Sequence, residues 1–522
     1  MVTINKRRRE FLKAAGLTAA SLTLPGCKSI SLQLAGKPPH PRPNILFIFS
    51  DDHACQAISS YGSRINKTPN IDRIAAQGAI FLNNFCGNSI CAPSRATVLT
   101  GKHSHIHGKI DNLVPFDNTQ PTFPMYLKKA GYQTAVMGKW HMDADPIGLD
   151  YWQILSGQGR YYNPEFTSPR GSKQYEGYAT DLITDLTLDW LKNGRDTKRP
   201  FLLMCNHKAP HRIWAPGPEH LTMYDNIEIP EPLTLFDDYS HRSPVLKQNE
   251  TMIARHMMYD YDLKVPGLGI PDDLGRDYKN FEYEAMTDEQ KKLWDAAYGP
   301  KNEKFKKSNL RGKDLVRWKY QRYIKDYLRC VDSVDDSVGR LLDYLEKVGL
   351  SKNTLVVYSS DQGFYLGEHG WYDKRWMYEE SFRMPLLVKW PGIIKPGTKV
   401  SALTQNIDFA PTFLNVANLP MPDDMQGQSL VPLFKGRTPP NWRDAVYYHY
   451  YEEGEHNVPR HEGVRDSRYK LIHFYGVGDW ELFDLQKDPH ELKSVYNDPA
   501  YSHIVKKMKE KLTALKKQYK VD

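Results

Sequence analysis

Cysteine is scarce in this 522-residue chain, and no long apolar segment follows its N-terminal region. Cys55, Cys86, Cys205 and Cys330 are scattered, which excludes a disulfide-rich scaffold. Beyond residue 26, no stretch approaches the ~20 apolar residues that a membrane-spanning helix needs. The chain is long enough for a large core and more than one domain.

An excess of one charge is also missing. The formal net charge is +8, and residues 1–26 contribute five basic side chains against Glu10, so their removal leaves a charge near +4. A nucleic-acid binder needs a concentrated basic face, so this balance argues against a nucleic-acid partner. The sequence also contains no internal repeat.

The N-terminal residues resemble an export signal rather than folded structure. A basic start precedes the apolar stretch 14–24, and residues 8–13 are similar to a twin-arginine signal. Residues 24–27 resemble a lipoprotein cleavage box with Cys27 as the acylated residue, and an ordinary cleaved signal peptide is the alternative. We predict an export signal at 1–27, a linker at 28–41, and a location in the bacterial periplasm or, through a lipid anchor at Cys27, at the cell envelope.

Short apolar runs alternate with helical patterns along the chain. The runs, which are apolar on both faces and therefore typical of buried parallel strands, are 44–49, 134–137, 201–204, 354–358 and 385–388. Helical patterns end before glycines at 71–77 and 125–129, and the longest covers 315–348. The predicted fold class is α/β, a sandwich around a largely parallel sheet.

The chain divides into regions of different pattern. Residues 42–435 form the predicted main α/β domain, and within it 216–313 are polar with little periodicity, which favours an insertion over one face. From 436 to 522, three runs of alternating residues and a basic amphipathic pattern at 501–519 predict a smaller α+β subdomain with an antiparallel sheet.

Polar side chains follow four of the predicted strands. In an open α/β sheet, ligands bind at the carboxyl ends of the strands, so these residues are expected to meet. They are Asp51, Asp52 and His53 after the first run, Lys139 and His141 after the second, His207, Lys208 and His211 after the third, and Asp361 and Gln362 after the fourth. Taken singly, each is explained equally well as an ordinary loop residue.

The chemistry of this set divides by residue type. Asp51, Asp52, Asp361 and Gln362 offer hard oxygen ligands, which suit Ca²⁺ or Mg²⁺, and three converging carboxylates favour a cation between them. Lysines 139, 208 and 374 with Arg95 supply charge for an anion, and His141 and His211 can move protons. The set indicates a metal-assisted site for an oxyanion ester.

Cys91 is predicted to lie at the N-terminus of a helix. Pro93 suits a first helical turn, and residues 95–100 continue as a helix up to Gly101. Backbone N–H groups and the helix dipole favour anions there, and they favour a lowered pKa for an unmodified thiol. A structural cysteine beside a turn is the alternative.

Residues 91–101, which begin Cys91-Ala92-Pro93-Ser94-Arg95, resemble the extended signature of the formylglycine-dependent (type I) sulfatases of the alkaline phosphatase superfamily. Further segments resemble family motifs in the family order; they are 43–52, 138–141, 209–211, 359–363 and 366–374. The resemblance covers nearly the whole chain from residue 41 and is weakest at 216–313. It implies an alkaline-phosphatase-like sandwich and a sulfuric ester hydrolase.

The resemblance also implies roles for individual residues. A maturation enzyme would convert Cys91 to formylglycine, whose hydrate attacks the sulfur of a sulfate ester. One Ca²⁺, rather than Mg²⁺, would be held by Asp51, Asp52, Asp361, Gln362 and the modified Cys91, although many relatives carry Asn where this chain has Gln362. Asp361 would accept a proton, and Lys139, Lys374 and His211 would hold the sulfate. His211 would protonate the leaving alcohol, while His141 and Arg95 would orient the nucleophile and help release sulfate.

The finer resemblance is to bacterial glycan sulfatases, including those for 6-sulfated N-acetylglucosamine of mucin or glycosaminoglycans. The predicted sugar-contacting residues are Asn112, His369, Arg375, His456, Arg460 and His461. Two alternatives stay open: a phosphate or phosphonate ester hydrolase on the same scaffold, and a non-catalytic binder of sulfated glycan. One cluster of oxygen ligands favours one metal and therefore a sulfate.

Overall fold

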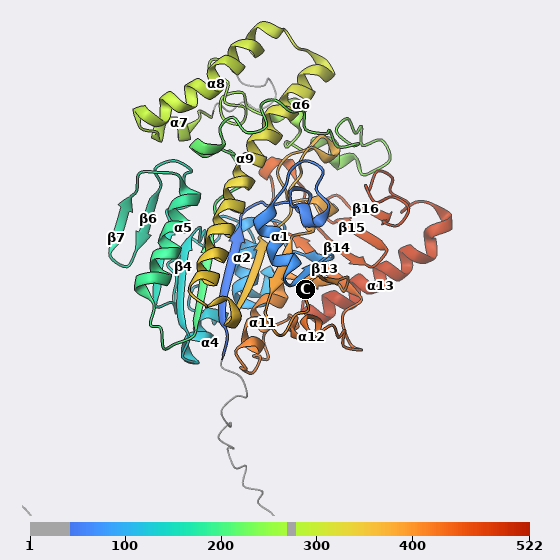
Figure 1. Cartoon of the computed structure of the whole chain (residues 1–522). Helices are drawn as coiled ribbons and strands as arrows, with labels where there is room; N and C mark the ends of the chain where they lie inside the picture. Colours follow the sequence, from blue (N-terminus) through green and yellow to red (C-terminus); the bar gives the residue numbers. More distant parts are fainter. Residues whose placement is uncertain (1–41, 269–277, 522) are drawn as a thin grey trace, which may run out of the picture. The chain divides into compact units, whose positions relative to one another are not determined.

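The computed structural model describes residues 42–268 and 278–521 (Figure 1). The predicted export signal, linker and acylated Cys27 lie outside these residues and stay predictions. None of the helices in the described ranges combines the length and the apolar character that a membrane crossing requires.

A ten-stranded sheet forms the centre, in the order β11-β2-β10-β9-β1-β8-β4-β5-β6-β7. Strands β9, β1, β8, β4 and β5 are parallel; they span Thr354–Ser360, Asn44–Ser50, Phe201–Asn206, Gln133–Gly138 and Tyr151–Leu155. The edges are β10 (Leu386–Lys389), β2 (Ala79–Phe81) and β11 (Thr398–Val400) on one side, and β6 (Glu165–Ser168) and β7 (Gly171–Gln174) on the other. Because β10 pairs antiparallel with both β9 and β2, the sheet is mixed, and it is largely parallel as predicted.

Helices cover both faces of this sheet. On one face, α1 (Pro69–Ala76), α5 (Ala179–Asp189) and α9 (Gly312–Lys347) pack against Leu46 and Ile48. On the other, α2 (Cys91–Thr100), α4 (Phe123–Lys129) and α11 (Phe409–Val416) pack against Phe47 and Phe49. Successive side chains of β1 therefore enter two different cores, which explains why its sequence is apolar throughout.

Shorter elements connect these layers. They are β3 (Asn84–Phe85), α3 (Ser104–His107), α10 (Glu379–Phe382), β12 (Thr404–Gln405) and α12 (Val431–Phe434).

A separate antiparallel sheet follows near the C-terminus, with α13 (Ser502–Tyr519) packed against it. Its strands are β13 (Ala445–Tyr450), β14 (His461–Asp466), β15 (Tyr469–Phe474) and β16 (Asp479–Asp484). Strand β14 was not expected, because its residues are mostly polar although every one is buried. Glu462 within it is balanced by Lys516 of α13 at 2.9 Å. The predicted domain boundaries stay predictions.

The region 216–313 contains more helix than its sequence indicated. It holds α6 (Ile253–His256), α7 (Phe281–Ala285) and the 21-residue α8 (Asp288–Ser308), which lie beside the start of α9 (Figure 1). Helix α8 begins at a capping box of Thr287 and Gln290. It buries few side chains, among them Trp294, Tyr298 and Phe305, so its apolar stripe is too narrow to stand out in the sequence.

Candidate active site

The carboxyl ends of β1, β8, β4 and β9 bring their polar residues together. Ser50 at the end of β1 lies opposite Ser360 of β9, so Asp51 and Asp52 face Asp361 and Gln362 across one sheet edge. Asp51, Asp52, Asp361 and Gln362 are almost completely buried. The backbone N–H of Asp52 donates to Asp361 Oδ1 at 3.1 Å, which fixes the two loops against each other.

Cys91 is the first residue of α2 and points into this cluster. Its Sγ lies 3.4 Å from Asp51 Oδ1, 3.0 Å from Lys374 Nζ and 3.8 Å from Gln362 Nε2. Burial raises the pKa of the thiol, and the charge of Asp51 raises it further, so Lys374 and Lys139 do not turn it into a thiolate. The lowered thiol pKa that the helix terminus favoured is therefore wrong, because neighbouring carboxylates and burial outweigh the helix dipole.

The oxygen ligands fit a divalent cation. Carboxylate oxygens of Asp51, Asp52 and Asp361 all lie within 4.8 Å of one another. Gln362 Oε1 is buried without a hydrogen-bond partner among the described residues, and the amide nitrogen lies beside Asp52. The carbonyl oxygen of this amide is therefore available to a cation. A set of three carboxylates and one amide is typical of Ca²⁺ or Mg²⁺ sites.

Three cationic side chains balance the carboxylates. Arg95 Nη2 lies 3.0 Å from Asp51 Oδ2 and 3.1 Å from Asp361 Oδ2. Lys139 pairs with Asp51, and Lys374 Nζ lies 2.6 Å from Asp52 Oδ1.

The two neighbouring carboxyls respond differently to this surrounding. Burial alone would raise the pKa of Asp51, but the charges of Lys139 and Arg95 hold it well below its ordinary value. Burial raises the pKa of Asp52 to about 7, because Lys374 offsets only part of the cost and Asp51 and Asp361 add like charge. Asp51 is therefore ionised at pH 7, whereas Asp52 titrates near that pH.

Two histidines lie at the rim. Nε2 of His211 lies 3.8 Å from Asp52 Oδ2, and its Nδ1 donates to the carbonyl of Arg212 at 2.6 Å. Nε2 of His141 accepts from the amide of Gln158 at 2.9 Å. Burial, reinforced by Lys139, lowers the pKa of both imidazoles well below the usual value, so both are neutral near pH 7. His141 has a positive φ of 56° and Asp52 one of 61°. Residues other than glycine rarely adopt this left-handed conformation, and such residues cluster at functional sites.

The profile of the sulfatase family matches residues 43–419 of this chain, and that of the C-terminal part of N-sulphoglucosamine sulphohydrolase matches residues 367–518. The chain belongs to the sulfatase family. It is a sulfuric ester hydrolase, and the predicted fold class is confirmed by its structural relatives.

Individual relatives agree with this membership. The chain is 46% identical to the N-acetylglucosamine-6-O-sulfatase of Bacteroides thetaiotaomicron over 97% of its length and 90% of the relative. It is 27% identical to the human N-acetylglucosamine-6-sulfatase over 83% of this chain and 71% of that protein. A protein solved in complex with its substrate D-glucosamine-2-N,6-O-disulfate superposes with a TM-score of 0.89 at 46% identity, covering 92% of this chain and 98% of the other.

One residue of this sulfatase site was missed. Gln158 follows β5, accepts from Lys139 Nζ at 2.6 Å and donates to His141, while its carbonyl accepts from Lys208 Nζ at 3.4 Å. It stands in the run Ser156-Gly157-Gln158-Gly159, which reads as a plain turn. The sequence pattern predicts no strand at residues 151–155, so only the pairing of β5 with β4 brings Gln158 to Lys139.

Three of the predicted sugar-contacting residues lie close to the cluster. Arg375 adjoins Lys374, pairs with Glu452 and lies 3.4 Å from Asp373. His456 Nε2 lies 3.4 Å from the same Asp373 carboxylate. Asn112 Oδ1 accepts from the backbone N–H of Ala92, next to Cys91, at 3.2 Å.

The other three lie apart from the cluster or are buried. Arg460 is exposed and pairs with Glu453 at 2.6 Å. His369 is completely buried with Asp237 at 2.9 Å, and His461 is completely buried against the ring of Trp376. Protein side chains surround His369 and His461, and the sugar contacts predicted for all three residues stay predictions.

Proposed function

We propose that this sulfatase removes the 6-O-sulfate from N-acetylglucosamine units of sulfated glycans, such as mucin or glycosaminoglycans. The relative with 46% identity over nearly the whole chain is a 6-O-sulfatase of this sugar. The structural relative at the same identity binds a glucosamine that carries a 6-O-sulfate. Both relationships extend through the C-terminal region, where the sugar-contacting loops are expected.

The observation that carries the proposal is the position of Cys91. It starts α2 with its side chain directed at Asp51, Lys374 and Gln362, and burial keeps the unmodified thiol protonated and unreactive. Conversion to formylglycine by a maturation enzyme supplies a hydroxyl nucleophile where the thiol cannot act as a thiolate. That hydroxyl would attack the sulfur, and the covalent intermediate splits one difficult hydrolysis into two steps.

The metal in this proposal is calcium. It would be held by Asp51, Asp52, Asp361, Gln362 and the modified Cys91, the same residues whose oxygens cluster at the ends of β1 and β9. When bound, such a cation neutralises these carboxylates and polarises the sulfate.

The side chains around the cluster divide the remaining work. Lys139 and Lys374 are buried cations beside the thiol and would stabilise the sulfate oxygens as charge moves onto them. His211 is neutral with its Nδ1 proton held by a carbonyl, so its Nε2 would gain a proton before donating it to the leaving alcohol. Asp361 would take the proton of the attacking hydroxyl, with Arg95 holding its other oxygen in place.

His141 would assist the release of sulfate. Nε2 of neutral His141 accepts from Gln158 and would release that hydrogen bond to take the proton of the second hydroxyl as the aldehyde reforms. Arg375, His456 and Asn112 are proposed to contact the sugar, with Arg460 at the exposed edge.

A panel of sulfated monosaccharides tests the substrate. N-acetylglucosamine 6-sulfate should be hydrolysed faster than the 3-sulfate or galactose 6-sulfate, as measured by sulfate release. A chromogenic sulfate ester should likewise be cleaved faster than the phosphate ester of the same alcohol. Faster turnover of the phosphate ester would contradict the sulfatase assignment, and faster turnover of another sugar would contradict only the substrate.

A further inference from the structure

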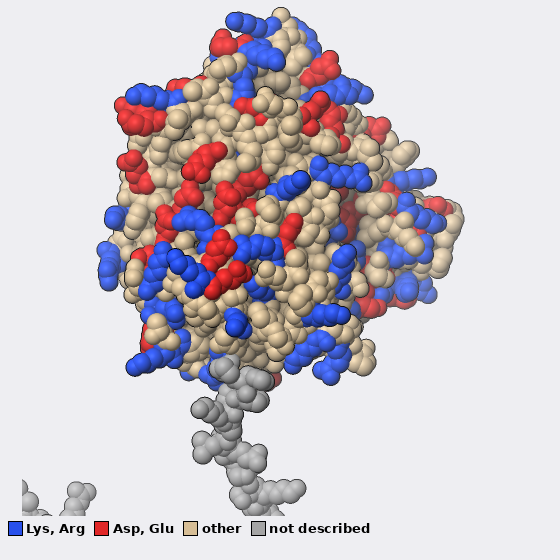
Figure 2. All heavy atoms as spheres, in the orientation of Figure 1, with Lys and Arg blue, Asp and Glu red and all other residues tan. Residues whose placement is uncertain are grey.

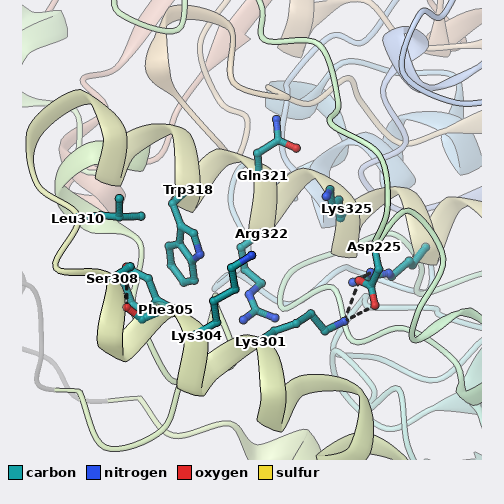
Figure 3. A pocket seen from close by; sticks show the side chains of 11 residues that line it. Asp225, Lys301, Lys304, Phe305, Ser308, Leu310, Trp318, Gln321, Arg322 and Lys325 are labelled. Carbon is teal, nitrogen blue, oxygen red and sulfur yellow. Dashed lines mark hydrogen bonds and ion pairs between the residues drawn. The ribbon is translucent and has the colours of Figure 1, made fainter.

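A basic pocket lies between α8 and α9, apart from the catalytic cluster (Figure 3). Its volume is about 420 Å³. Among the described residues, the charged side chains that line it are Lys301, Lys304, Arg322, Lys325 and Arg329 with one carboxylate, Asp225. On the face of the molecule in Figure 2, basic and acidic side chains are interspersed.

Two of the five cations are neutralised by protein carboxylates. Arg329 lies 2.6 Å from Asp225 and 2.7 Å from Asp326. Lys301 lies 2.8 Å from Asp225, which is drawn as a dashed line in Figure 3. Apart from Asp225 and Asp326, no carboxylate in the described part of the chain lies at ion-pair distance from the five cations of the pocket.

The other three cations, Lys304, Arg322 and Lys325, have no ion-pair partner in the described part of the chain. Arg322 is 7% exposed, and its one hydrogen bond runs from Nη2 to Asn302 Oδ1 at 2.6 Å. Its other guanidinium nitrogens have no partner among the described residues. Burial lowers the pKa of Arg322, and burial together with nearby Arg329 lowers the pKa of Lys325. Full solvation would leave neither pKa lowered. The charged forms of Arg322 and Lys325 are therefore destabilised in the pocket, and a bound anion would stabilise them.

An aromatic surface adjoins these cations. The indole of Trp318 stacks on Phe305, with ring centroids 3.5 Å apart and planes 11° from parallel. The Arg322 guanidinium lies 5.5 Å from the Trp318 ring, and Figure 3 shows both side chains directed into the same space as Lys304. A half-buried aromatic ring offers a flat apolar face, while unpaired cations offer charge-assisted hydrogen bonds. The apolar face of a sugar ring can stack on the aromatic ring, and a sulfate group on that sugar can accept hydrogen bonds from the cations.

The pocket and the catalytic centre contact opposite sides of α9. Trp318, Arg322 and Lys325 follow one another at helical spacing on the side toward α8. Tyr327 points to the sheet instead, and its hydroxyl donates to the carbonyl of Asp52 at 2.7 Å. The pocket therefore adjoins the centre through one helix without opening into it.

We propose that the α8–α9 pocket is a second saccharide site, which binds a sulfate-bearing sugar without cleaving it. The pocket carries neither a nucleophilic cysteine nor a cluster of metal ligands among its described residues, so it holds the glycan and does no chemistry. The proposal does not depend on which sugar the catalytic centre desulfates.

Calorimetric titration with a sulfated glucosamine–uronic acid tetrasaccharide tests the site. The wild type should show a second binding event besides that at the catalytic centre. In the double variant K304E/K325E, the affinity of that second event should fall by about tenfold or more. The control K292E/K347E makes the same charge change at exposed positions of α8 and α9 outside the pocket, and it should bind as the wild type does. An unchanged second event in K304E/K325E would overturn the proposal.

Two further ligands separate a sugar site from a simple anion site. Inorganic sulfate and the desulfated tetrasaccharide should each bind the pocket more weakly than the sulfated tetrasaccharide. If inorganic sulfate binds as tightly, the saccharide assignment is wrong, and if the desulfated sugar does, the role of the cations is wrong. Trp318→Ala should weaken tetrasaccharide binding while leaving sulfate binding unchanged. Trp318→Phe replaces it if the alanine variant fails to fold.

Turnover of a small chromogenic sulfate ester separates this proposal from the catalytic one. K304E/K325E should cleave it at the wild-type rate, because neither lysine touches the catalytic centre. A fall in this rate would show that the pocket is not independent and would overturn the proposal. A wild-type protein that cleaves no sulfate ester would contradict the proposed function, and the calorimetric result would still decide the pocket.

Discussion

The catalytic centre and the α8–α9 pocket both gather cationic side chains from separate elements, but they balance the charge in different ways. In the catalytic centre, Arg95 and Lys139 pair with Asp51, and Lys374 pairs with Asp52. In the pocket, Lys304 and Arg322 have no carboxylate partner among the described residues. Paired cations hold reactive groups at fixed positions, whereas unpaired ones retain their capacity to bind an anion.

The largest expected effect separates chemistry from binding. Cys91→Ala should lower the rate of sulfate ester hydrolysis by at least ~10⁴-fold, since it removes the nucleophile, while binding at the α8–α9 pocket stays unchanged. The rate is measured with protein made in a host that contains the maturation enzyme. In the wild type, mass spectrometry of the Cys91 peptide should show a mass lower by that of H₂S less one oxygen atom.

Cys330→Ala is the matched control for this substitution. Cys330 is a buried cysteine of α9 that contacts Tyr178 rather than the acidic cluster, so its loss should leave the hydrolysis rate within a few-fold of the wild type. Full activity of Cys91→Ala would contradict the assigned nucleophile.

The second prediction compares two buried arginines. Arg95→Gln should lower the free energy of unfolding by about 3 kcal/mol, because Asp51 and Asp361 lose a buried partner. Arg322→Gln should change it by about 1 kcal/mol or less, because among the described residues no carboxylate lies at ion-pair distance from that side chain. Denaturant unfolding of the two variants measures the difference. Equal losses would show that Arg322 is held by the protein and is not available to a ligand.

The smallest expected effect concerns Lys208, a cation beside the catalytic cluster without a carboxylate at ion-pair distance among the described residues. Burial, with Lys139 nearby, lowers its pKa from 10.5 to about 8. Between pH 8 and 10.5 the unfolded state binds more protons, so stability should rise with pH across this window and be lowest below pH 8. Lys208→Met should remove that rise and stabilise the protein at pH 7 by about 2 kcal/mol, a value reduced from the full shift for relaxation around the site.

Thermal or denaturant unfolding between about pH 7 and the ordinary lysine pKa checks this difference between wild type and Lys208→Met. Parallel pH curves would mean that Lys208 is solvated or paired in the folded protein, and they would contradict this prediction.

Several parts of the fold and the site were accessible from the sequence because they depend on local pattern. The buried strands at 44–49 and 354–358 are apolar on both faces, and both are central strands here. The glycine after the predicted helix at 91–100 ends α2 at the expected place. Since parallel strands end at one edge of a sheet, the residues directly after each strand, among them Asp51, Asp361 and Lys139, could be placed together from the sequence.

Other parts were not accessible, because they depend on which elements meet. Gln158 looks like a turn residue, and only the pairing of β5 with β4 brings it to Lys139. His369 and His461 are polar loop-like residues in the sequence but are completely buried by aromatic and charged neighbours from distant segments. The pKa of the Cys91 thiol also followed its neighbours rather than its own helix.

The sequence by itself determined the family chemistry of this protein, because the motif at Cys91 and the residues at the strand ends are local features of the chain. Only the tertiary structure decided how each charge is balanced. Arg95 and Arg322 are both buried arginines on helices, yet one faces two carboxylates and the other faces a pocket. Packing of α2 against the sheet edge and of α9 against α8 makes that difference, and such contacts between distant segments leave no periodic trace in the sequence.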